Sequence, residues 1–170
     1  MRGHIVLATA RGRFDRAGPP DCSLGAADDW DRWAGRLGPD PLRRDASPER
    51  AIARMRVSAQ PIGALLLDQK VLAGVGNVFR AEALFVNGLH PSRPGRECSE
   101  EDLRGLWQTI AAMLRQGVKD NRIVTIDRPR FPLPKGTARL GATTYVYHRD
   151  LCLLCDASAY TFNFAGLACY

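Results

Sequence analysis

The sequence predicts a mainly α fold in which a helical domain is followed by a small β-hairpin module. Three observations lead to this prediction. Residues 103–119 hold an apolar stripe at helical spacing, and residues 62–68 and 78–85 form two shorter helical patterns on either side of a glycine-rich turn. Closer to the C-terminus, two β-rich aromatic runs flank a pair of cysteines at Cys-x-x-Cys spacing.

The composition excludes several classes of protein. The chain has 170 residues, of which 45% are hydrophobic and 25% charged, a mixture typical of globular rather than disordered or fibrous proteins. Its net charge of +6 favours a polyanionic partner. No apolar stretch approaches the roughly 20 residues that cross a bilayer, and the first residues do not form a secretory signal. We therefore expect no membrane partner and a cytoplasmic location.

The first 36 residues carry the weakest structural signal. A short β-like run covers residues 4–8, and Gly, Pro and Asp clusters follow it without a sustained period. Residues 37–42 contain two prolines, which disfavour helical backbone at the positions before them, so we expect an extended linker and a domain boundary there. The expected domains are an N-terminal segment 1–36, a helical domain 37–120, a basic loop 121–142 and a hairpin module 143–170.

Start signals define the helices of the helical domain. Ser47 caps a helix that extends to about Val57. Pro61 opens the next helical segment, which is apolar nearly all round and should be buried on most of its surface. Ser99 and the acidic residues after it form a capping-box-like start for the longest helix, which we expect to end near Lys119.

The last 50 residues change character. Residues 120–142 lose the helical period and hold five Lys and Arg against two Asp, an excess of three positive charges, which predicts a loop that attracts anions. Residues 143–148 and 160–164 are rich in β-branched and aromatic side chains. We therefore expect a small β-hairpin in the module that contains Cys152 and Cys155.

The glycine-rich turn Gly74-Val75-Gly76-Asn77 is the strongest candidate for a binding site. Its glycines allow close approach of another molecule, and its amides and Asn77 lie at the N-terminus of the next helix, a geometry that suits a phosphate. The pattern lacks the preceding strand and third glycine of a dinucleotide site, and Lys70 precedes the glycines where a Walker loop has its lysine after them. We expect no nucleotide cofactor. A tight helix–helix turn without a ligand remains the alternative.

These residues resemble the formamidopyrimidine-DNA glycosylase and endonuclease VIII family of base-excision repair enzymes. The run 61–85 is similar to the family's helix-two-turn-helix motif throughout, and His90-Pro91 follows the motif as in the family. Residues 37–42 resemble the linker that enters the family's helical domain, and residues 145–155 resemble the first half of its zinc finger. The resemblance covers about two-thirds of the chain and implies double-stranded DNA as the partner.

The resemblance also implies which residues contact DNA. Asn77 and the amides around the two glycines would hold DNA phosphates, and Lys70 would lie near the backbone at a lesion. The basic loop 121–142 occupies the place of the loop that reads an extruded base. The expected DNA-binding residues are Lys70, Gly74, Gly76, Asn77, Arg80 and Arg149.

The five cysteines favour free thiols or metal ligands over disulfides, because their number is odd and no export signal precedes them. The resemblance implies that Cys152 and Cys155 bind zinc, and Cys169 stands alone where a second pair is expected. A structural zinc site closes with four ligands, so one is missing, with His148 as the alternative fourth ligand.

The family's chemistry uses an N-terminal proline followed by glutamate on a β-sandwich domain. This chain starts Met1-Arg2-Gly3, so we expect that domain to be missing and assign no catalytic residue. The leading hypothesis is a protein that binds duplex DNA, damaged or abasic DNA included, in base-excision repair. Two alternatives stay open: glycosylase and abasic-site lyase activity through a partner chain or a substitute amine, or a truncated product without function. The candidate amines are Lys70, Lys119 and Lys135.

Overall fold

The computed structural model describes residues 4–17, 25–133, 140–164 and 167–169. The chain divides into two compact units, unit 1 (Met1–Arg36) and unit 2 (Leu37–Tyr170), and each is described by itself. No helix in the described ranges is long and apolar enough to cross a membrane.

Unit 1 contains a β-hairpin and a short helix. Strands β1 (His4–Thr9) and β2 (Gly12–Ala17) pair antiparallel, with His4 opposite Ala17 and Thr9 opposite Gly12. The expected β-like run 4–8 is confirmed by β1. Strand β2 and helix α1 (Asp29–Ala34) were not predicted, because their short, charged sequences show no apolar period.

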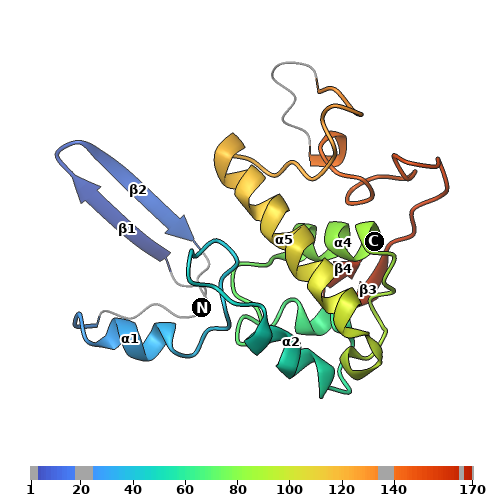
Figure 1. The fold of residues 1–170 in the computed structure, drawn as a ribbon. Helices are drawn as coiled ribbons and strands as arrows, with labels where there is room; N and C mark the ends of the chain where they lie inside the picture. The colour runs from blue at the N-terminus through green and yellow to red at the C-terminus, as the bar shows by residue number, and fades with distance from the viewer. Residues whose placement is uncertain (1–3, 18–24, 134–139, 165–166, 170) are drawn as a thin grey trace. The chain divides into compact units, whose positions relative to one another are not determined.

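In its described residues, unit 2 has four α-helices and is mainly α, as predicted (Figure 1). They are α2 (Glu49–Arg56), α3 (Ile62–Leu65), α4 (Asn77–Val86) and α5 (Glu100–Asp120), with a short 3₁₀ helix η1 (Gly95–Glu97) before α5. The long helix α5 packs against both α4 and α2. Their apolar faces enclose a core that includes Ile62, Leu66, Leu72, Leu103, Leu106 and Ile110.

The predicted start of α5 is confirmed, whereas the predicted cap of α2 is wrong by one residue. At α5, the Ser99 hydroxyl accepts from the Asp102 amide at 3.0 Å, and the Asp102 carboxylate accepts from the Ser99 amide at 3.0 Å, which is a complete capping box. At α2, the N-cap is Pro48, whose side chain cannot accept a hydrogen bond, and Ser47 lies one residue before it, where its hydroxyl accepts from the Glu49 amide at 3.3 Å. Helix α4 starts at Asn77, one residue earlier than the pattern indicated.

The linker 37–42 lies against the segment before the glycine-rich turn. The Gly38 amide donates to the Gln69 carbonyl at 2.8 Å, and the Ala73 amide donates to the Pro39 carbonyl at 3.2 Å. A Cβ on Gly38 would lie 2.4 Å from the Val71 carbonyl carbon, so only glycine fits at this crossing. The linker is therefore part of the packing around the turn.

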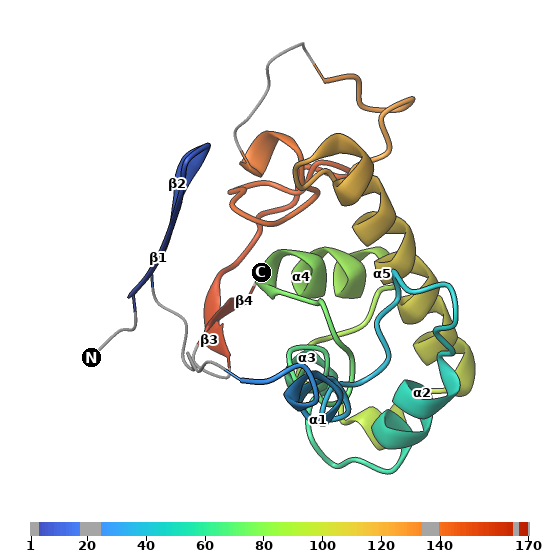
Figure 2. The same cartoon turned by 90° about the vertical axis from the view of Figure 1, so that its left-hand side faces the viewer.

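The predicted strand 143–148 is wrong. This segment has no strand structure, although residues 143–146 are buried. The amides of Tyr145, Val146 and Tyr147 donate to the carboxylate of Glu82 on α4, so they are not available to a β-ladder. Figure 2 shows this part of the chain, in orange, beside α4 and the last turns of α5.

A small antiparallel hairpin does occur in the C-terminal region, but from other residues. Strand β3 (Phe162–Phe164) pairs with β4 (Leu167–Cys169), with Phe162 opposite Cys169. The aromatic run 160–164 thus supplies one strand, as expected, while its partner is the chain that follows it. A short 3₁₀ helix, η2 (Leu140–Ala142), precedes the buried segment.

Candidate nucleic-acid interface

The glycine-rich turn presents the N-terminal end of α4 to solvent. Gly74 has φ +87°, in the left-handed region that disfavours side chains, and Gly76 is extended with φ −112° as the N-cap of α4. Both glycines are exposed, and a Cβ on Gly76 would meet no atom within 4 Å. The first amides of a helix lack intrahelical acceptors and carry the positive end of its dipole, so this end can accept an anion.

Gln69 holds the turn in shape. Its side-chain amide donates to the Val75 carbonyl at 2.9 Å, and its side-chain carbonyl accepts from the Gly74 amide at 2.8 Å. The expected role of the Gly74 amide is corrected here, because this N–H is directed to Gln69 rather than toward a ligand. Gly74 contributes its positive φ instead. Sequence inspection missed Gln69, since a single amide side chain next to Lys70 has no distinguishing spacing.

Lys70 lies on the surface before the turn. Its side chain is exposed, its backbone amide donates to the Asp68 carboxylate at 2.9 Å, and its carbonyl accepts from the guanidinium of Arg54 on α2. These backbone contacts fix the position from which the ammonium group extends. A flexible cation beside an open helix terminus adds attraction for a phosphate.

Asn77 is the first residue of α4 and is half-buried. Its side-chain amide donates to the hydroxyl of Tyr147 at 3.4 Å, across 70 positions of sequence. The ring of Tyr147 lies 4.7 Å from that of His148 between centroids. The segment 143–148 therefore reaches the open end of α4, which brings a second part of the chain to the candidate interface.

Glu82 connects the same two parts of the chain inside the protein. Its side chain is 0% exposed. One carboxylate oxygen accepts from the Val146 and Tyr147 amides, each at 2.9 Å, and the other from the Tyr145 amide at 2.6 Å and the Thr125 hydroxyl at 2.5 Å. The signal for this role was an acidic residue in the middle of a largely apolar helix, which the sequence reasoning passed over.

Arg80 does not belong to the interface, and its predicted contact with DNA is wrong for this structure. Its side chain is 0% exposed. The five consecutive residues from Arg80 to Leu84 are all buried, which is more than one full helical turn, so α4 is enclosed on every side there. A guanidinium at this position cannot reach a strand on the surface.

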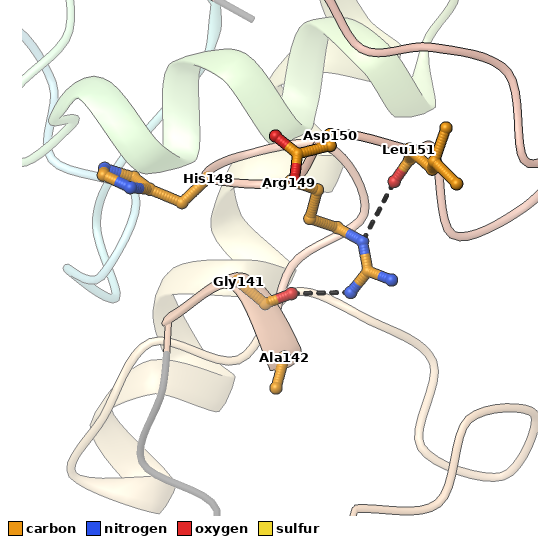
Figure 3. Close-up of a pocket in the computed structure, with 6 residues that line it drawn as sticks. All are labelled: Gly141, Ala142, His148, Arg149, Asp150 and Leu151. Carbon is orange, nitrogen blue, oxygen red and sulfur yellow. Dashed lines mark hydrogen bonds between the residues drawn. The ribbon is translucent and has the colours of Figure 1, made fainter.

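Arg149 lines a pocket of about 360 Å³ formed by residues 141–142 and 148–151 (Figure 3). Its Nη1 donates to the Gly141 carbonyl at 2.6 Å and its Nε to the Leu151 carbonyl at 3.2 Å. Asp150 and His148 also line the pocket. The two carbonyls hold the half-buried guanidinium in one orientation, so Arg149 is a fixed cation rather than a mobile one.

The basic loop 121–142 is described except for residues 134–139. Its first residues pack on the segment after it: the Thr125 amide donates to the Thr143 carbonyl at 2.9 Å, and the Asp127 amide to the Tyr145 hydroxyl at 2.9 Å. Arg128 forms an ion pair with Asp120. The predicted cations Lys135 and Arg139 lie outside the described residues, so their part in the suggested base-reading loop stays a prediction.

The cysteine pair forms a tight turn after the segment 143–148. The Cys152 thiol is buried and accepts from the Leu154 amide at 3.4 Å, while Cys155 is exposed. The side chain of the third predicted ligand, Cys169, lies outside the described ones. Among the side chains that the structure describes, no three His, Cys, Asp or Glu gather closely enough to hold a metal ion. Cys152 and Cys155 thus lie in one turn, and the zinc site stays a prediction.

Three comparisons with known proteins agree on a family. The sequence profile described as the formamidopyrimidine-DNA glycosylase H2TH domain matches residues 37–128, more than half of the chain. Endonuclease 8 1 of Mycobacterium tuberculosis is 39% identical over 135 residues, covering 71% of this chain and 46% of that protein. Formamidopyrimidine-DNA glycosylase of Thermus thermophilus is 42% identical over 84 residues, covering 49% of this chain and 32% of the relative.

Solved structures show the same likeness. The crystal structure of the MutM (Fpg) protein from Thermus thermophilus has a TM-score of 0.70 at 28% identity and covers 99% of this chain and 69% of that one. The Lactococcus lactis Fpg in complex with a Fapy-dG containing DNA has a TM-score of 0.69, covering 84% and 52%, and at 22% identity it supports the fold alone. The chain spans about half the length of its Mycobacterium relative. The profile match and the motif around Gly74 show that the chain belongs to the formamidopyrimidine-DNA glycosylase and endonuclease VIII family, of which it carries the helix-two-turn-helix part.

Proposed function

We propose that this chain binds duplex DNA through the open N-terminal end of α4, as the helix-two-turn-helix part of a glycosylase-like repair protein. The observation that carries the proposal is the exposed turn at Gly74 and Gly76, which leaves the first amides of α4 and Asn77 facing a surface that Lys70 borders. A DNA phosphate fits such a terminus because it meets both N–H donors and the positive end of the helix dipole. The family membership and the net charge of +6 support the same partner.

The proposed interface has two parts on one surface. The first is the α4 terminus with Lys70, and the second is the segment that carries Tyr147 and Arg149. The Asn77–Tyr147 hydrogen bond joins them, so a strand held at the α4 terminus would pass beside this segment. Phosphate contacts position a protein without reading the base sequence, so we expect binding that depends on salt more than on sequence.

Substitutions at the turn test this proposal. Asn77→Ala should lower the affinity for a short duplex about tenfold or more, since hydrogen bonds to charged groups contribute about 1.5–3 kcal/mol. Lys70→Ala should also weaken binding and should reduce the slope of log K against log salt by about 0.9, the value for one phosphate contact. Both are measured by fluorescence anisotropy across a salt series.

Arg96→Ala is the matched control for the loss of one exposed positive charge. Arg96 lies in η1, where its amide is bonded to the Ser58 carbonyl beyond the end of α2. Its removal should leave the affinity within about twofold, as for an exposed charge away from the contact. Unchanged binding in both turn variants would remove the proposal.

The alternative function is glycosylase or abasic-site lyase activity, which the names of the relatives favour. Its chemistry needs an amine that forms a Schiff base with the sugar aldehyde. Lys70 and Lys119 are exposed amines, and Lys135 lies outside the described residues. Borohydride added to the protein with an abasic duplex separates the two functions: a covalent adduct supports lyase chemistry, while binding without an adduct supports a DNA-binding protein.

We also propose that the C-terminal cysteines bind a zinc ion, with the thiolates of Cys152 and Cys155 as two of its ligands. The described residues support this by placing both thiols in one turn, with an amide hydrogen bond to the Cys152 sulfur that would stabilise its negative charge. Bound zinc would fix the orientation of this turn and of the hairpin that follows. No step of DNA binding depends on it.

Thiol labelling tests this proposal. In zinc-free protein, Cys155 should react with iodoacetamide well before Cys98, because Cys155 is exposed while burial raises the pKa of the Cys98 thiol and lowers its thiolate fraction. Added zinc should protect Cys152 and Cys155 and leave Cys98 unchanged, as read peptide by peptide in a mass spectrometer. Labelling of the pair at the same rate with and without zinc would contradict the proposal.

A further inference from the structure

Helix α2 has two exposed sides that differ in their balance of charge. On one side, Glu49 pairs with an arginine of α5 at 2.9 Å and Arg56 pairs with Glu100 at 3.0 Å, so positive and negative charges compensate each other. Arg50 and Arg54 lie on the other side, four residues apart and both exposed. In the part of the chain that is described, neither of these two forms an ion pair with an acidic side chain.

Both uncompensated arginines are held by backbone carbonyls of the chain next to α2. Arg50 Nη2 donates to the Leu37 carbonyl at 3.4 Å, where the linker begins. Arg54 Nη1 donates to the Lys70 carbonyl. The linker and the segment before the glycine-rich turn run side by side here, because the residues adjacent to these two carbonyls are hydrogen-bonded to each other. The two guanidiniums therefore lie along one crossing of the chain.

Arg54 connects this pair to the proposed DNA contact. It binds the carbonyl of Lys70, whose exposed side chain borders the open end of α4, and the preceding residue, Gln69, holds the turn in shape. Three exposed cations thus follow one another from the turn to α2, namely Lys70, Arg54 and Arg50. Asp68 lies beside them, with its carboxylate 2.9 Å from the Lys70 amide. Three positive charges against this one negative charge leave an excess of two.

Guanidiniums in this arrangement suit the phosphates of a nucleic-acid strand. A guanidinium has five N–H donors, and each of these two uses one of them on a carbonyl, so others are available for phosphate oxygens. Side chains four residues apart on a helix start about 5–6 Å from each other, and the phosphates of one DNA strand follow at about 3.4 Å along the axis. The pair can therefore contact nearby phosphates of the same strand.

We propose that Arg50 and Arg54 form a second phosphate-contacting surface, which continues the contact of the α4 terminus across Lys70 onto α2. This inference rests on the proposed function and extends it: the strand that is held at the glycine-rich turn continues over α2. The ligand is the sugar–phosphate backbone, so this surface has no preference for a base sequence. Side chains that are already held in place lose less conformational freedom on binding, so more of their attraction appears as affinity.

Removal of the two charges tests the proposal. Arg50→Gln combined with Arg54→Gln should lower the slope of log K against log salt by about 1.8, twice the 0.9 expected for one phosphate contact, and should weaken binding at low salt on the order of tenfold. Arg56→Gln combined with Arg104→Gln is the matched control, because it removes two charges from the ion-paired side, and it should leave the slope unchanged. Fluorescence anisotropy of a labelled duplex across a salt series measures both. Equal slopes in the two double variants overturn the proposal.

Lysine substitutions separate a contact with DNA from a purely structural role. Arg50→Lys combined with Arg54→Lys keeps both charges but gives up the planar groups that bind the two carbonyls. For a phosphate contact, the slope should return to within about 0.5 of that of the unmodified protein, because lysine binds phosphate as a point charge. If the lysine variant binds as weakly as the glutamine variant while both remain folded by circular dichroism, the arginines act by shaping the linker, and the proposed contact is wrong.

The proposed function and this inference fail in distinguishable ways. If the unmodified protein shows no salt-dependent binding to the duplex, the proposed function fails. If Asn77→Ala weakens binding and the glutamine variant of α2 does not, the function stands and only this inference fails. If the glutamine variant weakens binding while Asn77→Ala and Lys70→Ala do not, the contact on α2 is supported and the α4 terminus is not the binding site.

Discussion

Glu82→Ala is expected to lower the free energy of unfolding by more than about 3 kcal/mol, because each buried donor left without a partner costs about 1–3 kcal/mol. Three backbone amides, those of residues 145–147, lose their acceptor together. The Thr125 hydroxyl can turn to the Thr143 carbonyl, at 3.2 Å, so its loss adds little. Urea unfolding followed by the circular dichroism of the helices measures the change.

Glu101→Ala provides the comparison for this prediction. Glu101 is exposed in the first turn of α5, and its truncation should change the free energy of unfolding by less than about 0.5 kcal/mol, as is usual for surface positions. A loss below about 1 kcal/mol in Glu82→Ala would mean that the amides find other acceptors. The carboxylate would then not be what shapes the segment 143–147.

Gly38→Ala should lower the free energy of unfolding nearly as much as Glu82→Ala, by about 3 kcal/mol. This value is at the upper end of the range for overpacked sites. Its Cβ would lie 2.4 Å from the carbonyl oxygen of Val71 and 2.7 Å from the backbone nitrogen of Leu72. These are backbone atoms between Gln69 and Ala73, both of which are hydrogen-bonded to the linker, so they cannot move aside as a flexible side chain does. Urea unfolding of unit 2 is the measurement.

Gly76→Ala is the matched change at a glycine in open space. A Cβ there meets no atom within 4 Å, and φ −112° is allowed for alanine. The free energy of unfolding of Gly76→Ala should stay within about 0.5 kcal/mol of that of the unmodified protein. The added methyl group at the open end of α4 should, however, lower DNA affinity. The two variants should thus separate folding from binding. If the Gly76→Ala protein were destabilised but bound DNA normally, the DNA would have to bind at another surface of the protein.

The elements that could be predicted from the sequence are those stabilised by neighbouring residues. Helix α5 was predicted because its apolar stripe and its capping box lie within one stretch of chain. The turn at Gly74 and the start of α4 followed from glycines that need no distant partner. The placement of Lys70 and Asn77 at this end of α4 was therefore available from the sequence.

The predictions that were wrong concern groups whose partners lie far away in the chain. Residues 143–148 have strand propensity, but Glu82, more than 60 positions earlier, takes their amides. Arg80 was assigned to the surface by its charge, although α4 is enclosed on all sides at that turn. The Gly74 amide was expected to be available, and the Gln69 side chain accepts from it instead.

The sequence by itself determined the helices of unit 2, the glycine turn and the family, since these depend on periodicity, capping residues and backbone freedom within short stretches of chain. Only the tertiary structure decided which polar groups face a ligand and which are used inside the protein. The reason is that a buried donor or acceptor must find a partner wherever the fold places one, and for Glu82 and Asn77 that partner is a segment that local propensity assigns to a strand.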